Sequence, residues 1–156
     1  MTWPLRDVLA GYRTTRVTAT TLDALLARGV AGPKTEALAD PRFRAAALGR
    51  AIVTRALYRR GEEAPVAAGG LARLTDEDTH AWAAFAADGT RRDRTVATRL
   101  ARTVLDWARV PARMHVHAEA TWADSFAAAL GFHSSGRVDE IGGVAGPWRE
   151  MRRNGP

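Results

Sequence analysis

The stretch Thr90–Phe132 decides the fold: TRRDRTVATRLARTVLDWARVPARMHVHAEATWADSFAAALGF. An arginine-rich turn opens it, and Thr95–Arg109 follows with apolar residues at helical spacing. Arg113–Ala118 has the composition of a strand, and a second helix is predicted over Trp122–Leu130, with Gly131 just past its end. This order predicts a helix–strand–helix unit whose most basic turn lies at a helix N-terminus, where an anion binds well.

The residues on either side of this stretch predict strands that pair mainly with their neighbours along the chain. Turn residues at 61–63 and 75–79 predict hairpins. Gly69 and Gly70 predict a bulge or a close packing contact within one strand. The other predicted elements are a helix over 3–12, a strand over 12–18, a helix from Thr20 or Thr21 to Arg28 ended by Gly29, a helix over 35–48 broken at Asp40-Pro41, and strands over 50–60, 65–74, 80–87, 132–139 and 148–153.

These elements predict the α/β (α+β) class. We expect a single mixed, mostly antiparallel sheet of about six to seven strands flanked by helices. At 156 residues the chain fits one domain with a real core. The predicted domain spans 1–156, and residues 1–11 form an N-terminal extension to it.

Composition excludes several kinds of chemistry. The chain has no cysteine, which rules out disulfides, thiolate metal sites and a cysteine nucleophile. No run approaches the roughly 20 apolar residues of a membrane span, so no membrane partner is expected. The N-terminal residues lack the pattern of a signal peptide. The sequence therefore predicts a cytoplasmic protein.

The charge of the chain is strongly basic. Its formal net charge is +6, its pI is about 11.1, and Lys34 is the only lysine. The arginines gather at 91–102, which suggests an anionic partner: nucleic acid or a phosphorylated cofactor. The alternative that the arginines only reflect a GC-rich genome stays open.

Three segments carry a resemblance to a known family. They are HAWAAFAADGT at 80–90, the run Arg92-Asp93-Arg94-Thr95-Val96-Ala97, and the helix that ends in Leu130-Gly131-Phe132. In this order and spacing they resemble the GNAT acyltransferase superfamily, from about Tyr12 onward. That family has a loop of the form Arg/Gln-x-x-Gly-x-Gly/Ala before a long amphipathic helix, and a later helix that ends in Leu-Gly-Phe.

The resemblance implies a GNAT-like acyl-CoA N-acyltransferase fold with acetyl-CoA, or another acyl-CoA, as cofactor. In the family, backbone N–H groups of the loop bind the pyrophosphate, and the fourth strand pairs with the pantetheine arm. Transferred to this chain, the cofactor-binding residues are Ala86, Ala87, Arg92, Asp93, Arg94, Thr95, Val96, Ala97 and Thr98.

Acyl transfer to an amine also needs a base. Glu119, at the end of the strand segment MHVHAE, is the first candidate, and a capping anion near Thr121 is the alternative role for it. His117 is the second candidate because its free pKa suits the task. His115, His117 and Glu119 alternate along the strand and share one face. A His-x-His pair can hold a metal, but the family needs none, and no metal site is predicted.

The chain departs from the family at four positions. Thr95 stands where the family has glycine, Ala120 replaces an asparagine, and Ala127 replaces a tyrosine thought to protonate the CoA thiolate. Asp93 places a carboxylate beside the expected anion site, where Arg91, Arg92 and Arg94 would offset its repulsion.

Two main functions follow from this sequence. The first is N-acyl transfer, from acetyl-CoA or a related donor, to an amine of a small molecule or peptide. The second is a GNAT-fold protein that has lost or changed the transferase activity and acts as a binding or structural module. Binding to RNA is a weaker third idea. A homodimer is also open, because Trp148 near the last strand suits a dimer edge as well as a core.

Overall fold

The computed structural model describes residues 9–32, 34–73, 79–117, 121–139 and 148–155. Its strands form one seven-stranded sheet in the order β1-β2-β3-β4-β5-β7-β6. All neighbours pair antiparallel except β4 and β5, which are parallel. The elements are β1 (Tyr12–Thr15), α1 (Ala19–Arg28), α2 (Lys34–Ala39), α3 (Pro41–Gly49), β2 (Ala51–Arg59), β3 (Ala67–Arg73), β4 (Thr79–Phe85), α4 (Arg91–Ala108), β5 (Ala112–His117), α5 (Thr121–Ala129), β6 (His133–Asp139) and β7 (Trp148–Arg153).

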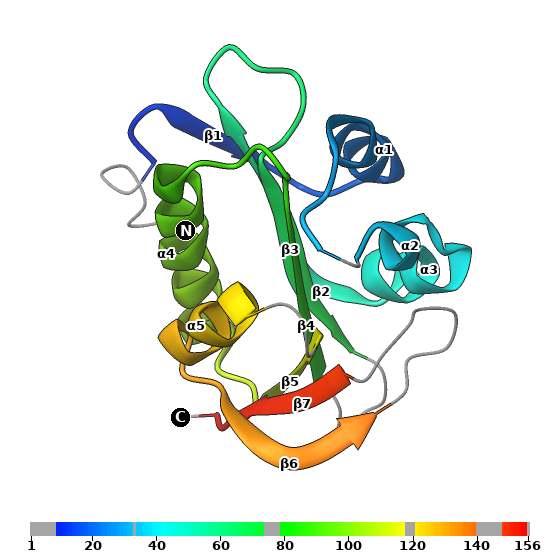
Figure 1. Ribbon diagram of the computed structural model, residues 1–156, viewed down its shortest axis with the longest axis vertical. Helices are drawn as coiled ribbons and strands as arrows, with labels where there is room; N and C mark the ends of the chain where they lie inside the picture. Colours follow the sequence, from blue (N-terminus) through cyan, green and yellow to red (C-terminus); the bar gives the residue numbers. More distant parts are fainter. Residues whose placement is uncertain (1–8, 33, 74–78, 118–120, 140–147, 156) are drawn as a thin grey trace.

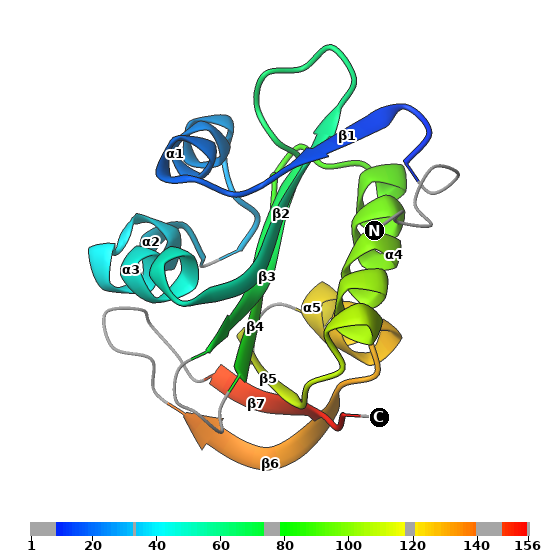
Figure 2. The same cartoon turned by 180° about the vertical axis from the view of Figure 1, so that it is seen from behind.

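The helices lie in two layers. Helices α4 and α5 cover one face of the sheet, and α1, α2 and α3 cover the other (Figures 1 and 2). The predicted fold class, a mixed and mostly antiparallel sheet flanked by helices, is confirmed. No helix within the described residues is both long enough and apolar enough to cross a membrane.

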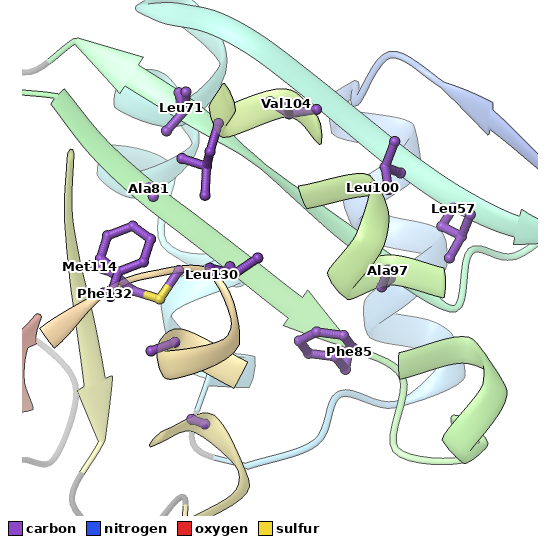
Figure 3. Close-up of a cluster of buried hydrophobic side chains, with 14 of the residues drawn as sticks. Leu57, Leu71, Ala81, Phe85, Ala97, Leu100, Val104, Met114, Leu130 and Phe132 are labelled. Atoms are coloured by element: carbon purple, nitrogen blue, oxygen red, sulfur yellow. The ribbon is translucent and has the colours of Figure 1, made fainter. Parts of the chain in front are cut away.

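Strand β4 contributes to a core on each face of the sheet because its side chains alternate. Ala81 and Phe85 join the cluster beneath α4 and α5, which Figure 3 shows. Trp82 and Ala84 join the cluster beneath α1–α3. Strand β4 is therefore held between two cores.

The glycine pair in β3 reflects close packing. A Cβ at Gly69 would lie 2.7 Å from the Trp82 carbonyl oxygen, and one at Gly70 would lie 2.6 Å from the Val53 carbonyl oxygen. Neither position leaves room for a side chain. The register shift of this strand pair is on β2, between Ala51 and Val53.

Several predicted boundaries in the first half differ from the structure. Helix α1 is capped by Thr18 and not by Thr20 or Thr21, because the Thr18 hydroxyl accepts a hydrogen bond from the Thr21 N–H. The helix predicted over 35–48 is two helices, as the Asp40-Pro41 break indicated, and Asp40 caps α3. Most of the helix predicted over 3–12, and residues 75–78 of the second predicted turn, lie outside the described residues.

The largest correction concerns α4. The sequence predicted its start at Thr95, but the helix begins at Arg91. The reason is a capping box: the Thr90 hydroxyl accepts from the Asp93 N–H, while the Asp93 carboxylate accepts from the Thr90 N–H. The arginine-rich turn of the prediction is thus the first turn of the helix.

Candidate functional site

The candidate site lies where β4 and β5 separate. These parallel strands share one register pair, His80 with Arg113, among the residues that the structure describes. Beyond it they diverge toward their C-terminal ends: in Figure 3, β4 runs past Ala81 to Phe85, while β5, which carries Met114, runs away from it. In an open sheet, ligands bind in the crevice outside the carboxyl ends of such strands. The first turn of α4 and the side of α5 border this crevice.

The edge of β4 that faces the divergence is already paired within the chain. The Ala86 N–H donates to the Val66 carbonyl on the β3 side, so Phe85 and Ala87 direct their backbone groups the other way. There the Ala87 N–H donates to the Gly29 carbonyl at 2.9 Å, and the Ala31 N–H donates to the Phe85 carbonyl at 2.9 Å. Residues 29–31, which we call the edge segment, therefore occupy this edge.

This pairing involves two of the predicted cofactor-binding residues. Ala86 and Ala87 were expected to offer their backbone to a pantetheine arm. Both N–H groups are engaged in the chain's own hydrogen bonds. A ligand that pairs with Ala87 must first release the edge segment.

The first turn of α4 offers fewer backbone donors than the sequence predicted. A helix leaves about four N-terminal N–H groups without intrahelical partners. The capping box uses those of Thr90 and Asp93, which leaves the N–H groups of Arg91 and Arg92. From Thr95 onward the N–H groups lie within the helix and bond to carbonyls one turn back. The expected backbone grip by residues 94–98 is thus not available.

Asp93 is turned into the protein, and this corrects its predicted place beside the anion site. Its carboxylate is 1% exposed. It accepts hydrogen bonds from the Tyr12 hydroxyl at 2.6 Å and from Arg59 Nη2 at 2.6 Å and Nε at 3.1 Å. Its charge is therefore balanced by Arg59 from β2, and not by Arg91, Arg92 or Arg94.

The contacts of this carboxylate shift two pKa values. Burial by itself raises the pKa of Asp93, but hydrogen bonds from Arg59, Tyr12 and Thr90 outweigh it and hold the pKa well below its usual range. Burial and the hydrogen bond to Asp93 raise the pKa of Tyr12 to about 12. Both groups keep their ordinary charge at neutral pH.

An ion-pair chain extends from Asp93 across the top of the sheet. Arg59 Nη1 donates to Glu62 at 3.0 Å, and Glu62 accepts from Arg28 at 2.6 Å. Arg28 also donates from Nε to Asp88 at 2.9 Å. The chain ties the start of α4, the end of β2 and the end of α1 into one rigid support.

The arginines of the first turn divide between two faces of α4. Arg92 donates to the Ala10 carbonyl at 3.1 Å, and its guanidinium lies 5.7 Å from the centre of the Tyr12 ring. Arg91 and Arg94 instead border a groove between α4 and α5. Only the second pair is placed to meet a ligand in that groove.

The groove has a volume of about 620 Å³, within the roughly 300–1,000 Å³ common for small-molecule sites. Residues of α4 at helical spacing form its basic wall, which is about 16 Å long at 1.5 Å per residue. Arg102 donates to the Ala129 carbonyl across the end of this wall. The lining residues are Phe85, Arg91, Arg94, Thr95, Thr98, Arg99, Arg102, Trp122, Ser125, Phe126 and Ala129.

Aromatic rings stand at the inner side of the groove. The Phe85 ring at the end of β4 meets Trp122 and Phe126 of α5, edge to face, with centroid distances of 5.3 and 5.1 Å. Ala127 is fully buried in the hydrophobic cluster against which these rings pack. Ala127, which stands where the resembled family has a tyrosine, therefore contributes no hydroxyl to the groove; the residues with hydroxyl groups in its lining are Thr95, Thr98 and Ser125.

The two predicted bases are not placed by the structure. Glu119 lies outside the described residues. His117 ends β5, where its backbone pairs with Trp148, and its side chain is not described. The neighbouring His115 places Nδ1 3.4 Å from His80 Nε2, on the sheet face opposite α4. Within the described part of the chain, no three histidine, aspartate or glutamate side chains gather as a metal site would require.

Three predicted cofactor-binding residues, Arg94, Thr95 and Thr98, line the groove, whereas Val96 and Ala97 point into the core. The prediction missed Arg91, Arg99, Arg102, Trp122 and Ser125 as members of one site. A signal for the α4 members was present. Positions 91, 94, 95, 98, 99 and 102 follow the i, i+3, i+4 pattern of one helix face, which becomes visible once the helix starts at Arg91.

Trp148 lies in the core, 2% exposed. The dimer edge that the sequence left open for it is therefore not formed by this side chain. Trp107 on α4 is 44% exposed instead.

No protein-family model matches the sequence, and no curated protein matches it either. Solved structures match over nearly the whole chain. The ribosomal-protein-S18-alanine N-acetyltransferase from Escherichia coli is 16% identical, with a TM-score of 0.60 over 91% of this chain and 92% of its own. A Bacillus subtilis acetyltransferase solved in complex with CoA is 10% identical, with a TM-score of 0.63 over 92% and 98%.

A spermidine N-acetyltransferase chimera from Vibrio cholerae and hSSAT is 12% identical, with a TM-score of 0.63 over 92% of this chain and 95% of its own. At such low identities the likeness concerns the fold.

Proposed function

We propose, from the premise that the chain has the fold of GNAT N-acetyltransferases, that it is an acyl-CoA-dependent N-acyltransferase. The donor is acetyl-CoA or another acyl-CoA, and the acceptor is an amine of a small molecule or peptide. One observation supports this above the others. The arginine-lined groove between α4 and α5 opens beside the divergence of β4 and β5.

The groove suits the phosphate groups of such a donor. Arg91 and Arg94 present guanidinium groups at the N-terminal end of α4, where the helix dipole also favours an anion. Arg99 lies further along the same wall. Thr95 narrows the approach that a glycine would leave open, so the side chains, and not the backbone, supply most of the contacts.

The reaction is direct attack of the amine nitrogen on the thioester carbonyl carbon. A C–N bond forms, the C–S bond breaks, the nitrogen loses a proton and the sulfur takes one. We assign the proton removal to Glu119, with His117 as second choice, either directly or through water. Because Ala127 carries no hydroxyl, the thiolate takes its proton from water or from the substrate ammonium.

The test is release of free CoA thiol from acetyl-CoA in the presence of a panel of amines. We expect amine-dependent release by the wild-type chain and a loss of about 100-fold in Glu119→Gln, the size typical of one acid–base group. Ala128→Leu on the exposed side of α5 is the matched control. Equal rates in wild-type and Glu119→Gln would reject Glu119 as the base.

A second candidate function rests on the edge segment. Because residues 29–31 already pair with Phe85 and Ala87, the fold also suits a protein that has lost or changed the transferase activity and acts as a binding module. CoA binding without thiol release for any amine would favour this second function. Release with any amine rules it out.

The remaining assignments stay proposals. We place the protein in the cytoplasm, with a homodimer as an open oligomeric state. Nucleic acid is a less favoured partner because the arginines of α4 line a groove. Binding to RNA predicts an affinity that falls steeply with salt, and salt-insensitive binding rejects it.

A further inference from the structure

A second space lies behind the groove, between the sheet and α4. It has a volume of about 70 Å³ and an almost entirely apolar lining, in which Arg55 is the only charged residue. Well-packed cores keep few voids larger than a water molecule. A water molecule needs roughly 10–15 Å³ by this measure, so the space holds about five water-sized groups.

The space exists because small residues face each other across it. Ala81 and Ala83 of β4 and Gly69 of β3 line the sheet side, and Ala97 and Ala101 of α4 line the helix side. Larger residues of the same cluster, including Leu57, Leu100 and Met114, border it and are labelled in Figure 3. Gly69 cannot be enlarged, since a Cβ there meets the Trp82 carbonyl.

The apolar space and the arginine groove have two lining residues in common. Phe85 and Phe126 line both, and their rings meet edge to face at a centroid distance of 5.1 Å, so this ring pair separates the two spaces. A ligand with an anionic part in the groove can extend an apolar part into the apolar space once these two rings turn apart. An apolar lining with hardly any polar partner favours a hydrocarbon chain over water.

From this shared boundary we infer that the cavity between β4 and α4 receives the hydrocarbon chain of a straight acyl donor longer than acetyl. The volume suits roughly four to six carbon-sized groups, so a hexanoyl group is about the length that fills it. This inference rests on the proposed function, because it assigns the acyl group that the same site would accept.

The experiment measures the dissociation constants of CoA, acetyl-CoA, butanoyl-CoA, hexanoyl-CoA and decanoyl-CoA by calorimetry. Each buried methylene should tighten binding about threefold to fourfold. The expected gain is about 100-fold from acetyl to hexanoyl, with no further gain at decanoyl.

The filling variant is Ala101→Leu, which places a larger side chain in the cavity from α4. It should leave the affinities for CoA and acetyl-CoA within twofold of wild type and abolish the gain at hexanoyl. Ala128→Leu makes the same change on the exposed side of α5 and should keep the gain. Ala101→Val serves if Ala101→Leu does not fold.

Each outcome decides between the claims. If CoA binds but chain length has no effect, the inference is overturned and the proposed function stands. A hexanoyl gain that survives Ala101→Leu also overturns it, because the chain then binds elsewhere. If CoA and all its thioesters fail to bind, the proposed function and the inference fall together.

Discussion

The two faces of the first turn of α4 have different roles. On the sheet side, Asp93 is buried and bonded to Arg59 and Tyr12. On the groove side, Arg91 and Arg94 border open space. One short sequence thus anchors the helix with one face and presents positive charge with the other.

The comparison teaches that a basic cluster cannot be counted as one anion site. Arg92 has the same side chain as its neighbours, yet its guanidinium contacts the Ala10 carbonyl and the Tyr12 ring. The anchored face also fixes the backbone of the turn from which Arg91 and Arg94 extend. Preorganised charges bind an anion better because less order is lost on binding.

The largest expected effect is on stability, from Asp93→Ala. The change leaves Arg59 and the Tyr12 hydroxyl without their shared acceptor and removes half of the capping box. We expect a loss of about 3–5 kcal/mol in the free energy of unfolding, as when one partner of a buried pair is removed. Denaturant unfolding measures it. Arg94→Ala on the groove face is the control, and a similar loss there would erase the distinction between the faces.

The second effect is on ligand affinity. Arg91→Gln combined with Arg94→Gln should weaken CoA binding by about 100-fold, because each charge-assisted contact contributes about 1.5 kcal/mol. Arg92→Gln removes the same charge from the adjacent position and should change the affinity by less than about threefold. Calorimetry at fixed salt measures both. An equal loss in Arg92→Gln would contradict the assignment of faces.

The third effect concerns how the stability of the fold depends on pH. The pKa of Asp93 lies well below the usual range of an aspartate when the chain is folded. Its ionised form therefore stabilises the fold above the unfolded pKa, and this contribution is lost as pH falls toward the folded pKa. Below about pH 4 the wild type should lose up to about 1.4 kcal/mol more per pH unit than Asp93→Asn. Unfolding curves between pH 5 and 2 test this, and parallel slopes would contradict it.

The smallest effect is at Thr95, on the groove face. Its hydroxyl donates to the Arg91 carbonyl, and its side chain narrows the groove. Thr95→Gly should tighten CoA binding by about threefold while lowering stability by a few tenths of a kcal/mol through helix propensity. Weaker CoA binding in this variant would show that the threonine side chain contacts the ligand favourably.

Much of the fold could be predicted from local patterns. Strand alternation, the Asp40-Pro41 break and the Leu130-Gly131-Phe132 ending each have a local physical cause, and the structure has strands and helices at those places. The start of α4 was misplaced because the arginines suggested a turn. The Thr90–Asp93 capping box, visible in the sequence, was overlooked.

The candidate site was less predictable because its key contacts are distant in sequence. Asp93 meets Arg59 across 34 positions. The edge segment meets β4 across more than 50 positions, through backbone groups that leave no side-chain pattern. No spacing rule within a helix or strand reaches that far, so these contacts required the fold.

The edge segment also gives this protein a built-in reporter. The amide protons of Ala31 and Ala87 are held by the two hydrogen bonds that join α1's exit to β4. Their exchange with deuterium should therefore be slow in the free protein. A ligand that takes over this edge must expose the Ala31 amide while it protects that of Ala87. Faster exchange at Ala31 together with continued protection at Ala87 would show that the ligand has replaced the edge segment, without any measurement of catalysis.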